Sequence, residues 1–149
     1  MKPVFTWSDA WVLGAVALGG GEHGAGLKEI IEAGDLINRA IFTPHQLRRG
    51  LAKLIHAGHV SAVAGQYAVV GDALLAARRL AYQNPSSYDL LQCFEDFLEA
   101  APYGTREAEE DDAQWPLPEV TDESVAAASA AHRAEYAALH KDAGGPKRS

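Results

Sequence analysis

The side chains best suited to chemistry in this sequence are basic, and they lie close together between Thr43 and Ala57. If Arg48, Arg49 and Lys53 occupy the outward face of a helix, they could attract a polyanion such as nucleic acid. They could equally be solvated charges that pair with carboxylates of the preceding segment. The carboxylates in question are Glu29, Glu32 and Asp35.

Other motifs offer weaker chemistry. His56 and His59 have a spacing that could join two metal ligands, but no cysteine or carboxylate stands nearby in sequence to complete a site. Cys93 lies at the border of an apolar stripe, where a thiol usually acts as a small hydrophobic group. No Ser/His/Asp or paired-carboxylate arrangement stands out. We therefore expect no metal, no cofactor and no enzymatic activity.

The helix that would present the cations has clear boundaries. Thr43, Pro44 and Gln46 fit the N-cap, first and third positions of a capping box. Gly58 fits the left-handed stop after it. Its apolar stripe consists of Leu47, Gly50, Leu51, Leu54 and Ile55. The residues expected to face outward are His45, Gln46, Arg48, Arg49, Ala52, Lys53 and His56.

Two helices are predicted before this one and a β-hairpin after it. The predicted elements are helices over residues 8–18 and 27–38 and strands over residues 59–63 and 66–70. Ser8 is the expected N-cap of the first helix. Gly34 lowers the helix propensity of the second unless a neighbour packs closely against it. Gly65 and Gln66 are the expected turn.

The rest of the chain divides by composition. A helix over residues 72–83 completes a domain over residues 1–83, followed by an amphipathic helix (85–100), an acidic proline-containing linker (101–121), an Ala-rich helix (122–142) and a disordered tail (143–149). The amphipathic helix either folds back on the domain or pairs with a symmetry mate. The linker is either a solvated spacer or a competitor of nucleic acid for the basic helix.

Three stretches, I-I-E-A-G-D-L-I-N, T-P-H-Q-L-R-R-G-L-A-K-L-I-H-A-G-H-V and G-Q-Y-A-V, follow one another as helix, helix and hairpin. Across about residues 5–80 the chain resembles the winged helix-turn-helix superfamily, including small bacterial winged-helix proteins. The resemblance implies a mainly α fold of three helices and a short β-hairpin wing, with additional C-terminal helices. It says less about activity, since winged helices also serve as protein-docking modules.

In DNA-binding members of this superfamily, the third helix enters the major groove. The resemblance therefore implies a transcriptional regulator that reads double-stranded DNA with the helix Thr43–Ala57. The residues that would meet base edges are His45, Gln46 and Arg49, and those that would hold phosphates are Arg48, Lys53 and Arg39. The predicted wing tip carries no Arg or Lys, so a homodimer would be needed for useful affinity.

Two other functions fit the sequence. A protein–protein interaction adaptor would dock a partner through the amphipathic helix and the acidic C-terminal region, and the basic helix would be incidental. A small-molecule sensor would line a pocket with aromatic side chains. The aromatic residues in question are Trp7, Trp11, Tyr82 and Tyr88.

Composition limits the class of protein. The 149 residues are 48% hydrophobic and carry a net charge of −7. Residues 1–80 contain eight Lys or Arg and six Asp or Glu, whereas residues 81–149 contain five and fourteen, which favours separate functional regions. The single cysteine suits a reducing cytosol. The longest apolar run, residues 10–18, is too short for a bilayer, and we see no secretory signal. These features predict a cytoplasmic protein with no membrane partner.

Overall fold

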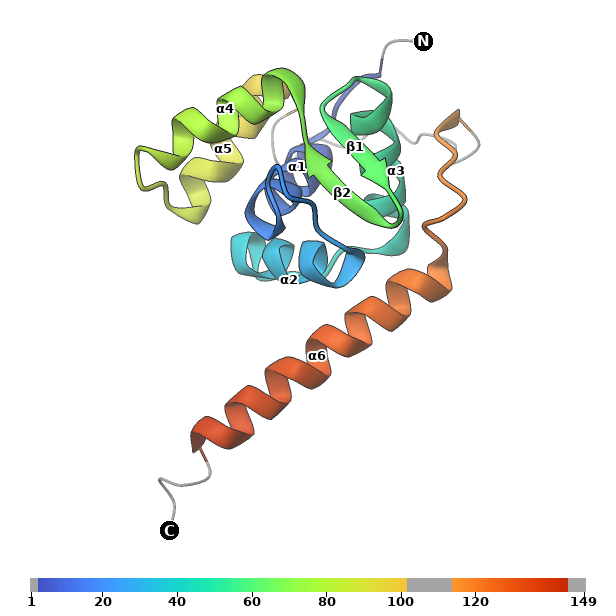
Figure 1. The fold of residues 1–149 in the computed structure, drawn as a ribbon, viewed down its shortest axis with the longest axis vertical. Helices are drawn as coiled ribbons and strands as arrows, with labels where there is room; N and C mark the ends of the chain where they lie inside the picture. Colours follow the sequence, from blue (N-terminus) through green and yellow to red (C-terminus); the bar gives the residue numbers. More distant parts are fainter. Residues whose placement is uncertain (1–2, 102–113, 145–149) are drawn as a thin grey trace.

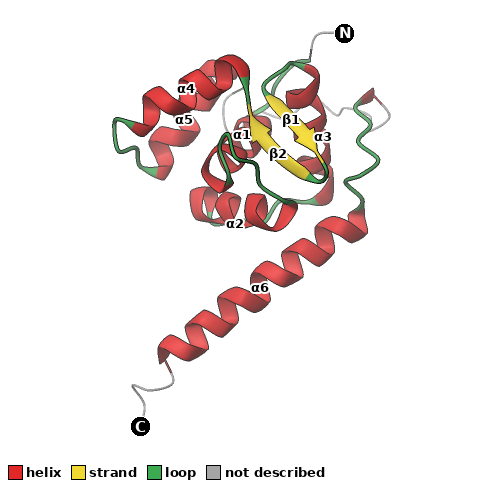
Figure 2. Cartoon of the chain, viewed as in Figure 1, coloured by secondary structure: helices red, strands yellow, loops and turns green. Residues whose placement is uncertain are grey.

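The computed structural model describes residues 3–101 and 114–144, and it has the mainly helical fold that the sequence predicts (Figure 1). The elements in chain order are α1 (Trp7–Gly19), α2 (Leu27–Asn38), α3 (Pro44–His56), β1 (Val60–Val63), β2 (Gln66–Val69), α4 (Gly71–Ala81), α5 (Ser87–Leu98) and α6 (Asp122–Gly144). Figure 2 shows the short antiparallel strand pair among these helices. The predicted helices and strands are confirmed, with boundaries shifted by a few residues at most. Residues 102–113 of the predicted linker and residues 145–149 of the predicted tail lie outside the described residues.

Helix α1 forms the centre of the core. Its residues from Ser8 to Val16 are all buried, because α2, α3 and α5 each pack against it. A helix that is apolar around most of its circumference must be covered on every side. The predicted N-cap at Ser8 is wrong. The cap is Thr6, whose N–H donates a hydrogen bond of 2.8 Å to Asp9 Oδ2 and so closes the first turn.

Gly34 allows Phe42 to pack closely against α2, which is the case that the sequence left open. A Cβ atom at this position would overlap the ring of Phe42. The Gly34 carbonyl also accepts a hydrogen bond of 2.9 Å from Trp11 Nε1, and the rings of Trp11 and Phe42 lie 3.9 Å apart between centroids. The space left by the missing side chain is therefore filled by aromatic packing, which offsets the low helix propensity of glycine.

The hairpin differs from the prediction in its turn. Val63 pairs with Gln66, so the two central residues are Ala64 and Gly65 rather than Gly65 and Gln66. Both have positive φ angles, 52° and 77°, as the type I′ turn requires, and that turn matches the twist of the flanking strands. The glycine-rich loop after α1 hydrogen-bonds to the other edge of β2 and fixes the hairpin to the core.

Helix α5 turns back along α4 and packs on α1 (Figure 1). Phe94 and Leu98, from the predicted apolar stripe, are 0% and 7% exposed. The fold-back alternative is therefore confirmed for this helix. The chain itself covers the central part of the stripe that was expected to form a homodimer. The homodimer stays a prediction.

Helix α6 extends beyond the rest of the protein (Figure 1). With 23 residues it is about 35 Å long. We call residues 114–144 the C-terminal arm. Val125 and His132 are buried against the body, whereas Tyr136 and Leu139 are exposed farther along. In the described residues, no helix has both the length and the apolar character needed to cross a membrane.

Candidate functional site

Lys53, which the sequence placed on the outer face of α3, is completely buried. Its Nζ donates hydrogen bonds to Asp9 Oδ2 at 2.9 Å and to the Val4 carbonyl at 2.8 Å. The same Asp9 oxygen accepts the Thr6 N–H, so one carboxylate joins the first turn of α1 to α3. The prediction that Lys53 faces outward is wrong, because a buried carboxylate from another helix compensates its charge.

Arg49 and Ala52 were also expected to face outward, and both are buried, with 5% and 8% of their surface exposed. Arg49 Nη1 lies 3.3 Å from Nε2 of His45, one turn earlier in α3. A surface helix has one exposed side, but α3 has α1 on one side and the C-terminal arm on another. The outward prediction is therefore wrong for both residues, and Ala52 lies beside Trp115 of the arm.

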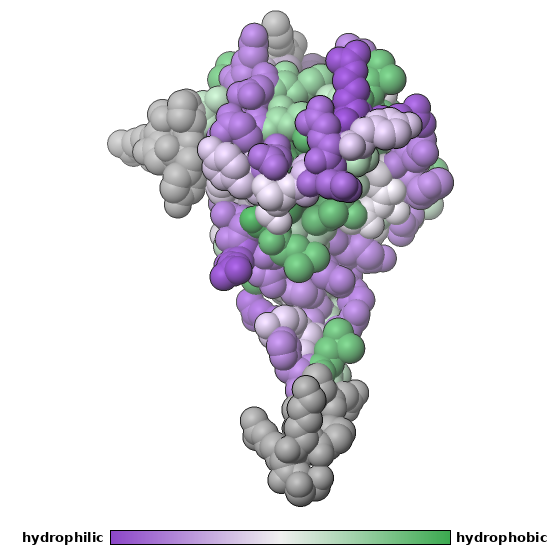
Figure 3. Space-filling view, turned by 90° about the vertical axis from the view of Figure 1, so that its left-hand side faces the viewer, coloured by the Kyte–Doolittle hydropathy of each residue, from purple (hydrophilic) through white to green (hydrophobic). Residues whose placement is uncertain are grey.

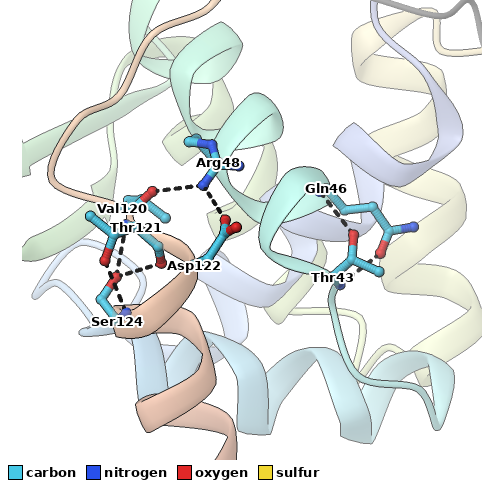
Figure 4. Close-up of polar contacts among 7 residues, drawn as sticks. All are labelled: Thr43, Gln46, Arg48, Val120, Thr121, Asp122 and Ser124. Atoms are coloured by element: carbon cyan, nitrogen blue, oxygen red, sulfur yellow. Dashed lines mark hydrogen bonds and ion pairs between the residues drawn. The ribbon is translucent and has the colours of Figure 1, made fainter.

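Arg48 is held by the C-terminal arm (Figure 4). Its Nη1 donates to the Val120 carbonyl at 3.1 Å and to Asp122 Oδ1 at 2.9 Å. Figure 4 shows this contact beside the first turn of α6, which Thr121 and Ser124 close with reciprocal hydrogen bonds. The Arg48 side chain is 20% exposed and that of Asp122 is 71% exposed, so the ion pair lies at the surface.

The start of the arm also covers α3. Trp115 is 7% exposed, and its ring packs edge-to-face on His56 with centroids 5.4 Å apart. Val120 is 1% exposed. The interpretation of the linker as a solvated spacer is wrong for residues 114–121, because these two side chains bury apolar surface against the body. Competition between the linker and nucleic acid stays a hypothesis.

The other three predicted DNA contacts are His45 and Gln46, on the first turn of α3, and Arg39, just after α2. His45 is exposed on the first turn of α3. Gln46 closes the predicted capping box, accepting from Thr43 N at 3.0 Å and donating its own N–H to Thr43 Oγ1 at 3.1 Å (Figure 4). Arg39 is exposed just after α2, with a φ of 54°, and it lines a groove between α2 and α6.

That groove has a volume of about 590 Å³. Leu36, Tyr136 and Leu139 line it, with exposed fractions of 65%, 57% and 63%. Within the same groove, His132 Nε2 lies 2.9 Å from Asp35 Oδ2. Figure 3 shows that the visible face is mostly hydrophilic, with apolar patches both on the body and on the helix that extends from it.

The four aromatic residues of the hypothetical sensor pocket are not brought together. Trp11 belongs to the core, and Tyr82 is 91% exposed. Trp7 and Tyr88 do line one cavity, together with Asn38 at the end of α2. The tertiary structure therefore assembles half of this set, in a cavity whose other walls the sequence did not reveal.

The two histidines of the His-x-x-His spacing contact different rings. His56 packs on Trp115, and the ring of His59 lies 5.0 Å from that of Phe97. Burial lowers the pKa of His59. Over residues 3–101 and 114–144, no three His, Cys, Asp or Glu side chains gather in a way that could hold a metal ion.

Sequence reasoning missed the partners of the cations. The spacing of Thr6 and Asp9 is a capping signal, but it does not reveal that Lys53 lies across from them. Trp115 and Val120 gave a clearer signal, since large apolar residues in an otherwise polar segment indicate that the segment packs against something.

Comparisons of the chain with models of protein families, with curated proteins and with solved structures gave no match. The functional interpretation below therefore depends on the geometry of the chain itself.

Proposed function

We propose that this chain is a non-enzymatic protein–protein interaction module with a winged-helix arrangement. The enclosure of α3 carries the proposal, because Lys53 and Arg49 are buried and Arg48 contacts the C-terminal arm. The order of three helices followed by a hairpin supports the winged-helix part of the proposal.

Reading of DNA by α3 would require its cations at the surface. If Lys53 moved to a phosphate, the Asp9 carboxylate would stay buried without its cation, and breaking a buried pair in this way costs about 3–5 kcal/mol. The turn of the hairpin, Ala64 and Gly65, adds no positive charge. Affinity for DNA depends on the number of phosphates that cations neutralise. Because Lys53 and Arg49 are buried, α3 has little attraction for DNA.

The groove between α2 and α6 provides a surface of the kind that protein partners bind. Single exposed leucines are common on soluble proteins, but Leu36, Tyr136 and Leu139 are exposed together along one concavity. Contiguous exposed apolar surface with a polar rim is typical of interaction sites. Arg39 and Glu135 supply such a rim.

Capture of a partner by the full chain, with identification and reconstitution from purified components, tests the proposal. The double variant Leu36→Asp, Leu139→Asp should bind the reconstituted partner at least about tenfold more weakly, since two apolar contacts are lost. The matched control is Leu18→Asp with Leu75→Asp, which changes two leucines that are each 51% exposed outside this groove. Equal weakening in both double variants would contradict an interaction through the groove.

DNA binding by an opened form is the second candidate, and the Arg48–Asp122 pair favours it. Surface ion pairs contribute only about 0–1 kcal/mol, so a phosphate could replace Asp122. Fluorescence anisotropy with a random-sequence duplex at low salt distinguishes the two functions. The interaction module predicts no saturable binding. The second candidate predicts binding that Asp122→Asn strengthens and Arg48→Ala weakens.

A further inference from the structure

A cavity of about 890 Å³ lies between the start of α1, the end of α2 and one face of α5. Trp7 and Tyr88 contribute aromatic rings to its lining, and Tyr88 is 73% exposed. Glu95, Asp96 and Glu99 contribute three carboxyl groups. We call this the acidic cavity. It combines aromatic faces with negative charge in one concave site.

The negative charge of the acidic cavity is not compensated by the described part of the chain. No Lys, Arg or His in residues 3–101 and 114–144 forms an ion pair with Glu95, Asp96 or Glu99. Asp96 accepts a hydrogen bond of 3.1 Å from Gln92 Nε2, a neutral donor. Burial and the nearby Asp96 raise the pKa of Glu95 above its usual value, as expected for a carboxylate without a cation.

The position of these carboxylates also opposes the stability of α5. Asp96 lies in the last turn, Glu99 is the C-cap, and no basic residue occupies this end of the helix. The helix dipole disfavours negative side chains at a C-terminus. Glu95 and Glu99 also line the same cavity, where their like charges repel each other. Local choices that reduce stability without a gain in the folded chain are expected where a binding site has been built.

The lining indicates which ligand would relieve this repulsion. Ammonium and guanidinium groups are attracted to the faces of tryptophan and tyrosine. Guanidinium also forms paired hydrogen bonds with carboxylates, and it is less strongly hydrated than ammonium. The cavity is open along α5 from Tyr88 to Ala100, so it can admit a side chain that remains attached to a peptide.

We propose that the acidic cavity binds an arginine or lysine side chain from a basic segment of a partner protein. The inference rests on the proposed function, because it specifies the chemistry of the partner and a second surface through which that partner is held. The cation supplies the positive charge that the described part of the chain does not bring to Glu95 and Glu99.

Isothermal titration calorimetry with the full chain tests the proposal. The probe is a blocked peptide of alternating arginine and glycine, compared with the same peptide in which citrulline replaces arginine. The arginine peptide should bind, with an affinity that falls as salt is raised, and the citrulline peptide should not. Glu95→Gln with Glu99→Gln should weaken binding of the arginine peptide about tenfold or more, because hydrogen bonds to charged groups are lost.

Two controls separate this site from general attraction to an acidic protein. Glu29→Gln with Glu123→Gln removes the same number of charges outside the acidic cavity and should leave binding unchanged. Tyr88→Ala should weaken binding several-fold, whereas Tyr82→Ala, which changes another exposed tyrosine, should not. The Glu95→Gln, Glu99→Gln variant should also be at least as heat-stable as wild type, since it removes repulsion at the end of α5.

Three results would overturn the proposal. They are absence of binding by the arginine peptide, equal weakening in the two charge-matched double variants, and spermidine binding as tightly as the peptide, which would identify a free polyamine as the ligand. Each outcome is distinct from failure of the proposed function. DNA binding through Arg48 would remove the interaction-module function and leave the peptide result unaffected.

Discussion

Two charged clusters in this protein are treated in opposite ways by the fold. On α3, the cations Arg49 and Lys53 are buried, and Arg48 is paired with the C-terminal arm. At the end of α5, Glu95 and Glu99 line a cavity and no cation of the described residues pairs with them. The basic cluster looks like a binding surface in the sequence, but two of its three cations, Arg49 and Lys53, are buried. The acidic cluster, which attracts little notice in the sequence, is the one that we propose binds a partner.

The difference shows that charge patterning predicts where charges lie along the chain but not which of them are accessible. Burying Lys53 requires a partner, and Asp9 provides it from a helix 44 positions earlier. Glu95 and Glu99 together at a helix C-terminus reduce the stability of the fold, so a bound cation that compensates their charge can restore it. Variants at the two clusters should therefore change stability in opposite directions.

The largest effect is expected at the buried ion pair. Lys53→Met leaves the Asp9 carboxylate buried without its cation, which should lower the free energy of unfolding by about 3–5 kcal/mol. Urea denaturation followed by circular dichroism measures this change. Lys28→Met is the matched control, because Lys28 pairs with Glu135 at the surface, and its midpoint should stay close to that of wild type. Similar midpoints for the two variants would show that the buried Lys53 does not stabilise the fold.

The anchor of the C-terminal arm should give the next largest effect. Trp115→Ala removes a ring that is 7% exposed and in contact with His56, and substitutions of this kind cost about 3–5 kcal/mol in a core and less at a boundary. We expect faster amide hydrogen exchange in α6 and α3 while α1 stays protected. Pro116→Ala, which changes an exposed neighbour, is the control. Unchanged exchange in α6 would mean that the arm is held elsewhere, for example by Val125.

A smaller effect, and one that depends on pH, is expected at His59, which lies between the rings of Phe5 and Phe97. Burial lowers the pKa of His59, so the folded state favours the neutral ring while the unfolded state takes up a proton below about pH 6.5. The stability contributed by this site is therefore complete above that pH and is lost as the pH falls toward the folded pKa. Melting temperatures at pH 7.5 and 5.5 should differ more for wild type than for His59→Phe.

The protonation of Glu95 should change stability with pH in the opposite direction to that of His59. Its pKa is raised in the folded state, so the folded protein gains relative stability as the pH falls through the range in which Glu95 takes up its proton. Glu95→Gln should remove that gain. A pH profile identical to that of wild type in both the His59 and the Glu95 variants would contradict the two assignments.

The smallest effect is expected at the surface pair between α3 and the arm. A double-mutant cycle of Arg48→Ala and Asp122→Ala should give a coupling energy of about 0–1 kcal/mol, because Asp122 is 71% exposed. A coupling well above this range would indicate that the arm is fixed to α3 and would weaken the case for an opened, DNA-binding form.

Most of the secondary structure could be predicted from local signals. The capping box at Thr43 and Gln46 and the left-handed Gly58 set the ends of α3 within a residue. At Gly34 the sequence left open whether a neighbour packs closely, and the ring of Phe42 does so. The N-cap of α1 and the hairpin turn were predicted one or two residues away from their places, since neighbouring residues were also suited to these roles.

The candidate sites were much harder to predict. The outer face of α3 was inferred from one apolar stripe, on the assumption that the opposite side meets water. That assumption failed for Arg49 and Lys53, which are both buried, Lys53 against Asp9 of α1. The acidic cavity draws Trp7, Asn38 and Glu95 from three separate elements, and no spacing along the chain relates them.

The sequence by itself determined the helices, the hairpin and the uneven distribution of charge, because capping, helical periodicity and turn chemistry act over a few residues. Only the tertiary structure decided which charges are accessible. Burial and ion pairing depend on residues that are distant in the chain, as Asp9 is from Lys53 and Asp122 is from Arg48. For this protein, long-range contacts place Lys53 in the core and pair Arg48 with the C-terminal arm, which local sequence patterns did not reveal.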